Sequence, residues 1–364
     1  MDTDALIERL VQIPGPSGFE DAVALAITDA LDGIDGEVSS DVIGNLVLTL
    51  SGPVDAPALM FMAHMDEVSL LVKHIDESGL LYCEANGLID ERTLPAGRVQ
   101  VWTEGGPVLG VVGAKSRHQV TAAEQRQPIV VNDLWIDVGA RSPSEVAELG
   151  IEIGMPATNW SPPARMANGH LVSKAIDNRA GCAVLVQVAH AVAARERDFT
   201  LQFVWAAQEE VGSRGARVAA QRLQPVAAVV VDTTPAGDPS TPLRYATAQV
   251  GGGPVIRAQD ARGATGTLYS QAVRRALRAA AEAEGVPYQL DVYPTWTDAC
   301  EVHLAGRGVA TGGLFLPRRC SHSPNEVADL ADIERAIALL TRFTDLDAAA
   351  VEAFAKRPAL PLVT

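Results

Sequence analysis

The chain has 364 residues, of which 48% are hydrophobic and 20% are charged, and its formal net charge is −16 at pH 7. This length exceeds what a single hydrophobic core usually reaches, so we expect two domains. The strong negative charge argues against nucleic acids and anionic lipid surfaces as partners, because both are negatively charged themselves.

No apolar run is long enough to cross a bilayer, because Asp, Arg or Glu interrupts each one. The first residues, 1–5, are acidic and lack the order of basic and then apolar residues found in a signal peptide. We therefore expect a cytoplasmic protein with no membrane partner. Cys83, Cys182, Cys300 and Cys320 show neither a disulfide framework nor a zinc-knuckle spacing, so we expect buried thiols.

The N-terminal region alternates helical and strand patterns. Helical spacing of apolar residues predicts helices over 5–11 and 20–31, separated by a turn-rich break at 13–18. Continuous apolar runs predict strands at 45–50 and 58–63.

The pattern of apolar residues changes over residues 68–160, where the apolar runs are short, alternate with polar residues and are separated by glycine. Strands are predicted at 70–75, 80–83, 99–102 and 108–112. This pattern is typical of a small antiparallel β domain. One short helix interrupts it, because Ser142 offers an N-cap, Pro143 the first helical position and Glu145 the third.

From about residue 171 the sequence again shows helical patterns alternating with apolar strands. Helices are predicted over 178–194 and 268–283, and a final amphipathic helix, running to Phe343, is predicted to be capped by Asp332. Helices that alternate with buried strands indicate a mixed, mostly parallel sheet flanked by helices. We assign residues 1–66 and 165–364 to one catalytic α/β domain and residues 67–164 to an inserted β domain.

Four apolar runs end on residues that are able to bind a metal. The runs 58–63, 201–208, 226–231 and 312–317 are followed by His64 and Asp66, by Glu209 and Glu210, by Asp232, and by His322. Such runs are typical of strands buried in a parallel sheet, whose active sites lie beyond the carboxyl ends of the strands. One crevice could therefore collect these side chains.

The charges of the candidate ligands fit a pair of divalent cations. His64, Asp177, Glu210, Asp232 and His322 supply three carboxylates and two imidazoles. Two divalent cations would leave one positive charge in excess, and a bridging hydroxide would cancel it. Such a pair lowers the pKa of the shared water and polarises a bound carbonyl. The mixture of ligands suits zinc, cobalt or manganese.

Two further carboxylates have predicted roles beside the metals. Asp66 lies two residues beyond His64, on the same face of a strand, and could accept the other imidazole proton or orient the ring from nearby. Glu209 cannot easily share a metal with Glu210, and is better placed to take a proton from the water and pass it to a leaving amine. The remaining histidines are interpreted as structural or surface residues: His74, His118, His170, His190 and His303.

Each of these elements also has an ordinary interpretation. His64 and Asp66 could form a surface pair, Glu209 and Glu210 a solvated face, and Asp177 a helix cap. Their common position after buried strands, together with the charge balance, favours a metal site.

The chain resembles a known family at these positions. The segments that carry the resemblance are 13–20, 64–67, 174–179, 208–215, 297–299 and 319–324. They are similar to the tetrahedral (TET-type) dinuclear-metal aminopeptidases, also called the glutamyl aminopeptidase or cellulase M family. The resemblance spans nearly the whole chain and implies a phosphorylase/hydrolase-like zinc-peptidase core with an inserted, barrel-like β domain.

The resemblance also implies residue roles, cofactors and assembly. Asp177 would bridge two divalent metals, His64 and Asp232 would complete one position, and Glu210 and His322 the other. Glu209 would be the general base and Asp66 the supporting acid. Zinc is the first choice of metal, with cobalt or manganese as alternatives. The peptide bond between Asp177 and Asn178 would be cis, and the inserted domain would form dimers that build a homo-oligomeric, tetrahedral dodecamer.

We therefore predict an aminopeptidase that removes N-terminal residues from short peptides. A dinuclear N-acyl amino acid deacylase needs the same ligands and is the main alternative. A glycosidase could use Glu209 and Asp66 as paired carboxylates, but that hypothesis leaves His64 and the other ligands without a purpose. A non-catalytic scaffold of the same fold would have lost a ligand or the base, and none is missing.

Overall fold

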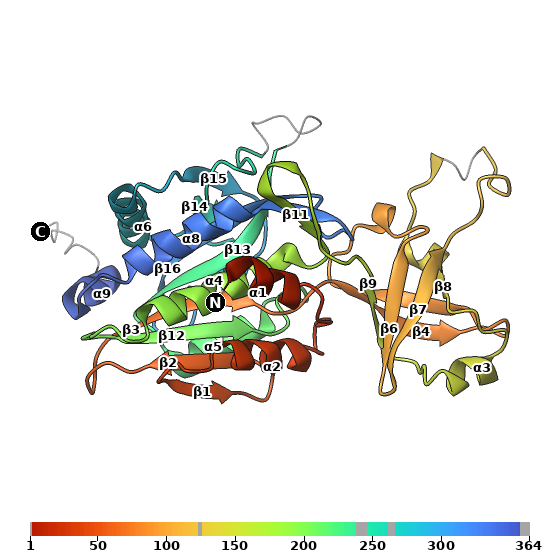
Figure 1. Ribbon diagram of the computed structural model, residues 1–364, viewed down its shortest axis with the longest axis horizontal. Helices are drawn as coiled ribbons and strands as arrows, with labels where there is room; N and C mark the ends of the chain where they lie inside the picture. The colour runs from red at the N-terminus through yellow and green to blue at the C-terminus, as the bar shows by residue number, and fades with distance from the viewer. Residues whose placement is uncertain (1, 123–125, 238–245, 261–265, 357–364) are drawn as a thin grey trace, which may run out of the picture.

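The computed structural model describes residues 2–122, 126–237, 246–260 and 266–356. The molecule has two parts that lie side by side, a sheet covered by helices and a smaller barrel (Figure 1). The helices are α1 (Thr3–Leu10), α2 (Asp21–Ala30), α3 (Pro143–Glu148), α4 (Ile176–Val192), α5 (Arg214–Leu223), α6 (Gln271–Glu284), α7 (Ala299–Val302), α8 (Leu330–Phe343) and α9 (Ala348–Ala355).

The strands fall into two groups. Those of the large sheet are β1 (Glu37–Ser40), β2 (Leu46–Leu50), β3 (Ala58–His64), β10 (Ala164–Arg165), β11 (His170–Ser173), β12 (Thr200–Ala206), β13 (Ala227–Pro235), β14 (Val255–Asp260), β15 (Gln289–Tyr293), β16 (Ala310–Arg319) and β17 (Glu326–Asp329). Those of the barrel are β4 (Ser69–Ile75), β5 (Leu81–Asn86), β6 (Arg98–Thr103), β7 (Gly106–Gly113), β8 (Trp135–Asp137) and β9 (Pro156–Asn159).

The centre of the large sheet is parallel. Its main path runs β1-β2-β12-β3-β13-β16-β17-β11-β10, and β12, β3, β13 and β16 are parallel neighbours. These four strands are the four apolar runs singled out in the sequence. The flanking pairs β2 with β12 and β14 with β16 are antiparallel, so the sheet is mixed as predicted.

Alternate residues of each central strand face opposite layers of helices. Leu59 and Phe61 of β3 belong to a core cluster with residues of α1, α2, α4, α6, α8 and α9. Met60 and Met62 of the same strand pack in a second cluster with residues of α5 and α7. Burial on both faces explains why these strands are apolar throughout instead of alternating.

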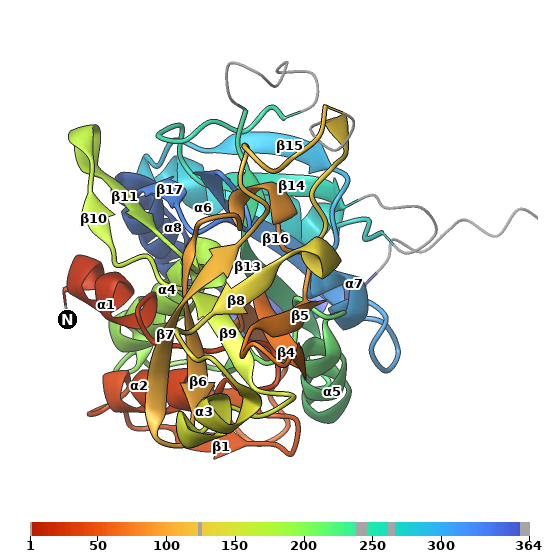
Figure 2. The same ribbon diagram turned by 90° about the vertical axis from the view of Figure 1, so that its right-hand side faces the viewer.

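The inserted segment forms a closed antiparallel barrel in the order β4-β5-β8-β7-β6-β9, which faces the viewer in Figure 2. It has its own apolar core, which includes Leu81, Val101 and Ile136. The predicted helix α3 is present, and the Ser142 hydroxyl caps it by accepting from the Glu145 N–H. The barrel strands lie within the predicted segment 67–164, while the domain limits themselves stay a prediction.

The prediction for the C-terminal amphipathic helix, α8, needs correction in its N-cap and its position. The N-cap of α8 is Asp329, whose side chain accepts from the Ala331 N–H, and not Asp332. Asp332 lies in the first turn, is buried, and accepts from the N–H groups of Gly251 and Gly253 at 2.7 Å each. Two aspartates with capping chemistry lie three residues apart, and the later one already accepts from the N–H groups of another loop, so the earlier one caps the helix. Helix α8 is also not the last, since α9 follows it.

Two smaller expectations also change. Helix α6 begins at Gln271, after its N-cap Ser270, and not at Leu268. Cys83, Cys182 and Cys300 are buried, but Cys320 is exposed because it lies in a left-handed turn just beyond β16.

Among the described residues, no helix combines the length and the apolar character that crossing a bilayer requires. The cytoplasmic location stays a prediction.

Replacing Phe61 by Ala tests the core directly. Phe61 is fully buried and packs against the rings of Phe203 and Phe343. The Phe61→Ala variant is expected to lose about 3–5 kcal/mol of stability, because it removes buried apolar contacts and leaves a cavity. Leu25→Ala, at a position that is 67% exposed, is the control and should change stability by less than about 0.5 kcal/mol. Urea denaturation measures both, and equal losses would contradict this description of the core.

Candidate metal centre

The metal-binding candidates meet at the carboxyl ends of the parallel strands. His64 is the last residue of β3, Asp232 lies in β13, and Glu209 and Glu210 follow β12. Asp177 lies at the start of α4, preceded by a left-handed residue, Ala175. His322 follows β16 in a turn where its own backbone is left-handed, which swings its ring back toward the other strands.

The first group of ligand atoms surrounds one oxygen of Asp177. The His64 Nε2 lies 3.3 Å from Asp177 Oδ1 and 3.5 Å from Asp232 Oδ1. The three side chains are buried, and Asp177 Oδ1 accepts no hydrogen bond although it is shielded from water.

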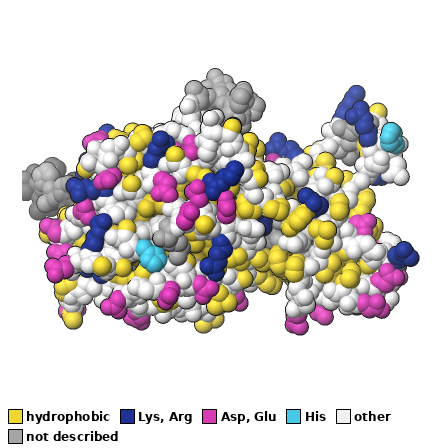
Figure 3. All heavy atoms as spheres, viewed as in Figure 1, with side chains coloured by type: hydrophobic (Ala, Val, Ile, Leu, Met, Phe, Trp, Pro, Cys, Tyr) yellow, Lys and Arg dark blue, Asp and Glu magenta, His cyan; other side chains and the backbone are white. Residues whose placement is uncertain are grey.

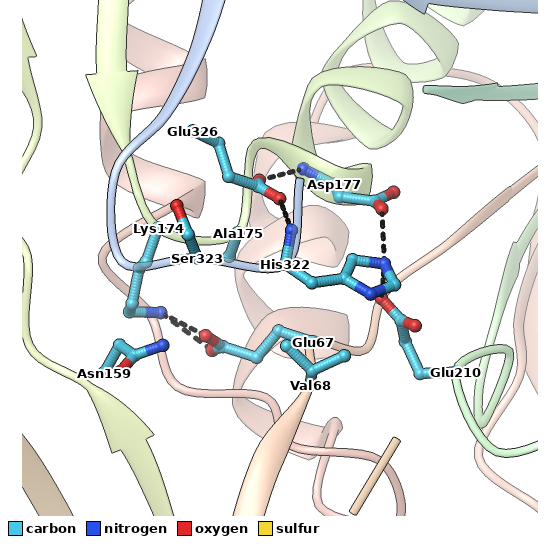
Figure 4. Close-up of a pocket in the computed structure, with 10 residues that line it drawn as sticks. All are labelled: Glu67, Val68, Asn159, Lys174, Ala175, Asp177, Glu210, His322, Ser323 and Glu326. Atoms are coloured by element: carbon cyan, nitrogen blue, oxygen red, sulfur yellow. Dashed lines mark hydrogen bonds and ion pairs between the residues drawn. The ribbon is translucent and has the colours of Figure 1, made fainter. Parts of the chain in front are cut away.

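The second group surrounds the other oxygen of the same carboxylate. The His322 Nε2 lies 3.3 Å from Asp177 Oδ2 and 3.6 Å from Glu210 Oε1. Figure 4 shows the His322 ring between Asp177 and Glu210. Asp177 thus offers one oxygen to each group, and all five predicted ligands lie together.

These separations suit two ligands of one cation. Charge-assisted hydrogen bonds are shorter, at about 2.7–2.9 Å. Ligands bound about 2.0–2.1 Å from a tetrahedral zinc ion lie roughly 3.3–3.4 Å from each other, because the tetrahedral angle sets their spacing. The observed distances of 3.3–3.6 Å therefore leave room for a metal ion at each group.

Backbone carbonyls orient both histidines. The Nδ1 of His322 lies 2.5 Å from the Leu88 carbonyl, and the Nδ1 of His64 lies 3.2 Å from the Asp66 carbonyl. A proton on each Nδ1 leaves the Nε2 lone pair free for a metal. Asp66 was predicted to take this proton with its carboxylate, but that oxygen lies farther away, at 3.5 Å.

The Asp66 carboxylate instead holds the loop that carries the two glutamates. It accepts from the Glu209 N–H at 2.9 Å, from the Glu210 N–H at 3.1 Å and from the Ser17 hydroxyl at 2.6 Å. Glu209 is buried, and its Oε2 lies 4.0 Å from His64 Nε2, farther than the atoms of Asp177 and Asp232. Glu209 therefore lies beside the first group and less close to its centre.

Asn45 also stabilises the loop that carries Glu209 and Glu210. Its side chain accepts from the Ala207 N–H at 2.9 Å and donates to the Gly215 carbonyl at 2.9 Å. A Cβ at Gly215 would lie 2.3 Å from the Ala207 carbonyl oxygen, so only glycine permits this close approach.

Burial of so many carboxylates shifts their pKa values. Burial raises the pKa of Glu209 well above its usual range and raises that of Glu210 to about 7. Burial would also raise the pKa of Asp177, but Arg318, His322 and His64 hold it well below its usual range. Burial disfavours a charged His322, yet Glu210 and Asp177 raise its pKa to about 9. The site thus has a strong affinity for positive charge.

The sequence did not predict a role for three residues that lie at the site. Arg318, on β16, donates to Asp177 Oδ2. Glu326, on β17, accepts from the Asp177 N–H at 2.9 Å and from the His322 N–H at 2.8 Å. Asp298 is buried, and neither carboxylate oxygen has a hydrogen-bond partner. A charged residue at the end of an apolar strand was the available signal for Arg318.

A small pocket opens beside the second group. Its walls include Asn159 of the barrel and the buried ion pair of Lys174 and Glu67, whose atoms lie 2.7 Å apart (Figure 4). The peptide bond between Asp177 and Asn178 is cis, as the resemblance implied.

A family model described as M42 glutamyl aminopeptidase matches residues 44–339 of the chain. The chain belongs to this family. The resemblance seen in the motifs is therefore confirmed, and this M42 protein is an enzyme, a peptide hydrolase of the aminopeptidase type with candidate metal-binding groups.

Individual relatives agree over nearly the full length. The M42 chain is 34% identical over 345 residues to the putative aminopeptidase SgcX of Escherichia coli (strain K12), covering 93% of this chain and 92% of that protein. Aminopeptidase APDkam598 from the archaeon Desulfurococcus kamchatkensis has a TM-score of 0.92 at 32% identity, covering 98% and 99% of the two chains. The TET1 peptidase of Pyrococcus horikoshii, which can assemble into a tetrahedron or a large octahedral shell, has a TM-score of 0.85 at 29% identity, covering 95% and 100%.

Asp298 predicts a pH dependence of stability for the metal-free M42 protein. Burial raises its pKa from 3.8 to about 8. The wild type therefore loses stability as the pH rises from 3.8, where the carboxyl ionises in the unfolded chain, to about 8, where it ionises in the folded protein. Asn is neutral at every pH, so the melting temperature of Asp298→Asn minus that of the wild type should increase from pH 5 to pH 9.

This difference is measured by thermal melting in EDTA. Asp35→Asn, at an exposed position, is the control and should show no such trend. A constant difference between Asp298→Asn and the wild type across this range would contradict the prediction.

Proposed function

We propose that this protein is a dinuclear metalloenzyme that removes N-terminal residues from short peptides. The observation that carries the proposal is the position of Asp177 between two groups of ligand atoms, one on each carboxylate oxygen. His64 and Asp232 would complete one metal position, and Glu210 and His322 the other. Zinc suits this mixture of imidazole and carboxylate, with cobalt and manganese as alternatives.

The bound cations would acidify a shared water and polarise the carbonyl of the scissile peptide bond. Glu209 would accept the proton of that water and deliver it to the leaving amine. Burial raises the pKa of Glu209 well above its usual range, and this supports the role, because a more basic carboxylate is a better proton acceptor. Asp66 would act indirectly, by fixing the backbone of Glu209 and Glu210.

An N-acyl amino acid deacylase needs the same ligands and remains the rival proposal. The two activities differ in whether the free amine of the substrate is required. An aminopeptidase should hydrolyse a free aminoacyl anilide at least about 100-fold faster than its N-acetylated form, which corresponds to about 2.7 kcal/mol of transition-state discrimination. Comparing kcat/KM for the two substrates distinguishes the two activities, and a preference for the N-acetylated form would contradict the aminopeptidase proposal.

Glu209→Gln separates proton transfer from metal binding. The variant keeps the size of the side chain and removes the base, so we expect full metal content and a kcat about 10²–10⁴-fold lower. Asp177→Ala is the contrasting variant and should lose both metals, because each position shares this residue. Metal analysis alongside turnover measures both, and unchanged turnover in Glu209→Gln would remove it from its role.

We also propose that the protein is a homo-oligomer assembled through the barrel into dimers and then a tetrahedral dodecamer. Hydrophobic side chains gather over the barrel on the face drawn in Figure 3. On β7, Leu109 and Val111 are 53% and 43% exposed and point to the same side of the strand. The likeness to the TET1 peptidase supports such an assembly.

A charged residue on β7 should disrupt this assembly. Leu109→Glu places a carboxylate in the proposed contact, where its desolvation is unfavourable. We expect analytical ultracentrifugation to show a smaller species than the wild type. Val54→Glu, at a fully exposed loop position, should leave the size unchanged. A wild type that sediments as a monomer would contradict the proposal.

A further inference from the structure

Arg318 is a buried cation in direct contact with the carboxylate shared by the two ligand groups. It is 3% exposed. Its Nη2 donates to Asp177 Oδ2, its Nη1 lies 3.1 Å from Glu326 Oε1, and its Nε donates to the Thr233 hydroxyl at 2.5 Å. The guanidinium is thus held from three sides.

Arg318 contacts only one of the two carboxylate oxygens of Asp177. Oδ1, which faces His64, accepts no hydrogen bond and keeps its lone pairs available. Oδ2, which faces His322, already accepts from Arg318. A cation bound by Oδ2 would compete with this hydrogen bond and would also lie close to a fixed positive charge.

Arg318 cannot withdraw easily from this contact. Glu326, its second partner, is itself fixed by the N–H groups of Asp177 and His322. Thr233 follows directly after the ligand Asp232 in β13. Moving the guanidinium away would break its hydrogen bonds to Asp177 and Thr233 and would leave the buried carboxylate of Glu326 without its ion-pair partner, which is strongly unfavourable.

The position of the guanidinium agrees with this geometry, because a fixed positive charge repels a cation most strongly where the two lie closest. The nearest pair of atoms places Arg318 on the His322 side of Asp177.

We propose that Arg318 makes the metal position formed by Asp177 Oδ2, Glu210 and His322 much weaker than the position formed by Asp177 Oδ1, His64 and Asp232. The inference rests on the proposed dinuclear function and adds a residue that sets the affinity of one metal. The enzyme then holds one metal firmly and gains the second only at higher metal concentration.

Calorimetric titration of the EDTA-treated full-length protein with Zn²⁺ tests the proposal. The wild type should bind in two steps whose dissociation constants differ by at least about tenfold, since a unit charge near the cation is worth more than this even at a high effective dielectric constant. Arg318→Met should strengthen the second step at least tenfold and leave the first within about threefold.

Two controls keep the result interpretable. Removing Arg318 alone leaves the negative charge of Glu326, which could itself attract zinc, so the gain must persist in the double variant Arg318→Met with Glu326→Gln. The double variant also restores charge balance if the single variant fails to fold. Arg319→Met removes the neighbouring arginine, which contacts His170 and no ligand, and should titrate like the wild type.

The outcomes separate this inference from the proposed function. Two steps of equal affinity in the wild type, or a second step that stays unchanged in the double variant, would overturn the role of Arg318 while leaving a dinuclear enzyme. A wild type that binds no zinc would overturn both.

Discussion

The structure depends on a concentration of buried carboxylates whose negative charge Arg318 and the two histidines offset only in part. Asp66, Asp177, Glu209 and Asp232 are buried together at the ends of the parallel strands, and Glu210 lies beside them. Removing several negative charges from water is strongly unfavourable unless positive charge accompanies them. Burial accordingly raises the pKa of Glu209 and Glu210. Cations at the two positions beside Asp177 would relieve this cost, which links the binding of metal to the stability of the site.

Segments distant in the sequence hold this arrangement together. Near the N-terminus, Ser17 donates to Asp66, and Glu20 accepts from the Gln208 N–H. The inserted segment supplies the Leu88 carbonyl that orients His322. The barrel region therefore contributes to the candidate site as well as to the proposed assembly. Its strands nevertheless have an apolar core of their own, separate from that of the large sheet.

The sequence predicted the features that depend on local pattern. Continuous apolar runs identified the four parallel strands, and the polar residues after them include four of the five candidate ligands, because such strands deliver their ends to one edge of a sheet. The fifth candidate, Asp177, lies at the start of α4. The pattern could not show which of two aspartates, Asp329 or Asp332, caps a helix, since both have the same chemistry. It also missed Arg318, because only the fold brings the end of β16 to the start of α4, where the guanidinium contacts Asp177.

The central claim is that the carboxylate of Asp177 lies between two metal ions. Anomalous X-ray diffraction at the zinc absorption edge, from crystals saturated with zinc, tests it most directly. The account predicts two peaks on opposite sides of this carboxylate, one in contact with His64 and Asp232 and the other with Glu210 and His322. Peaks elsewhere, or a single ion that contacts both histidines, would contradict it.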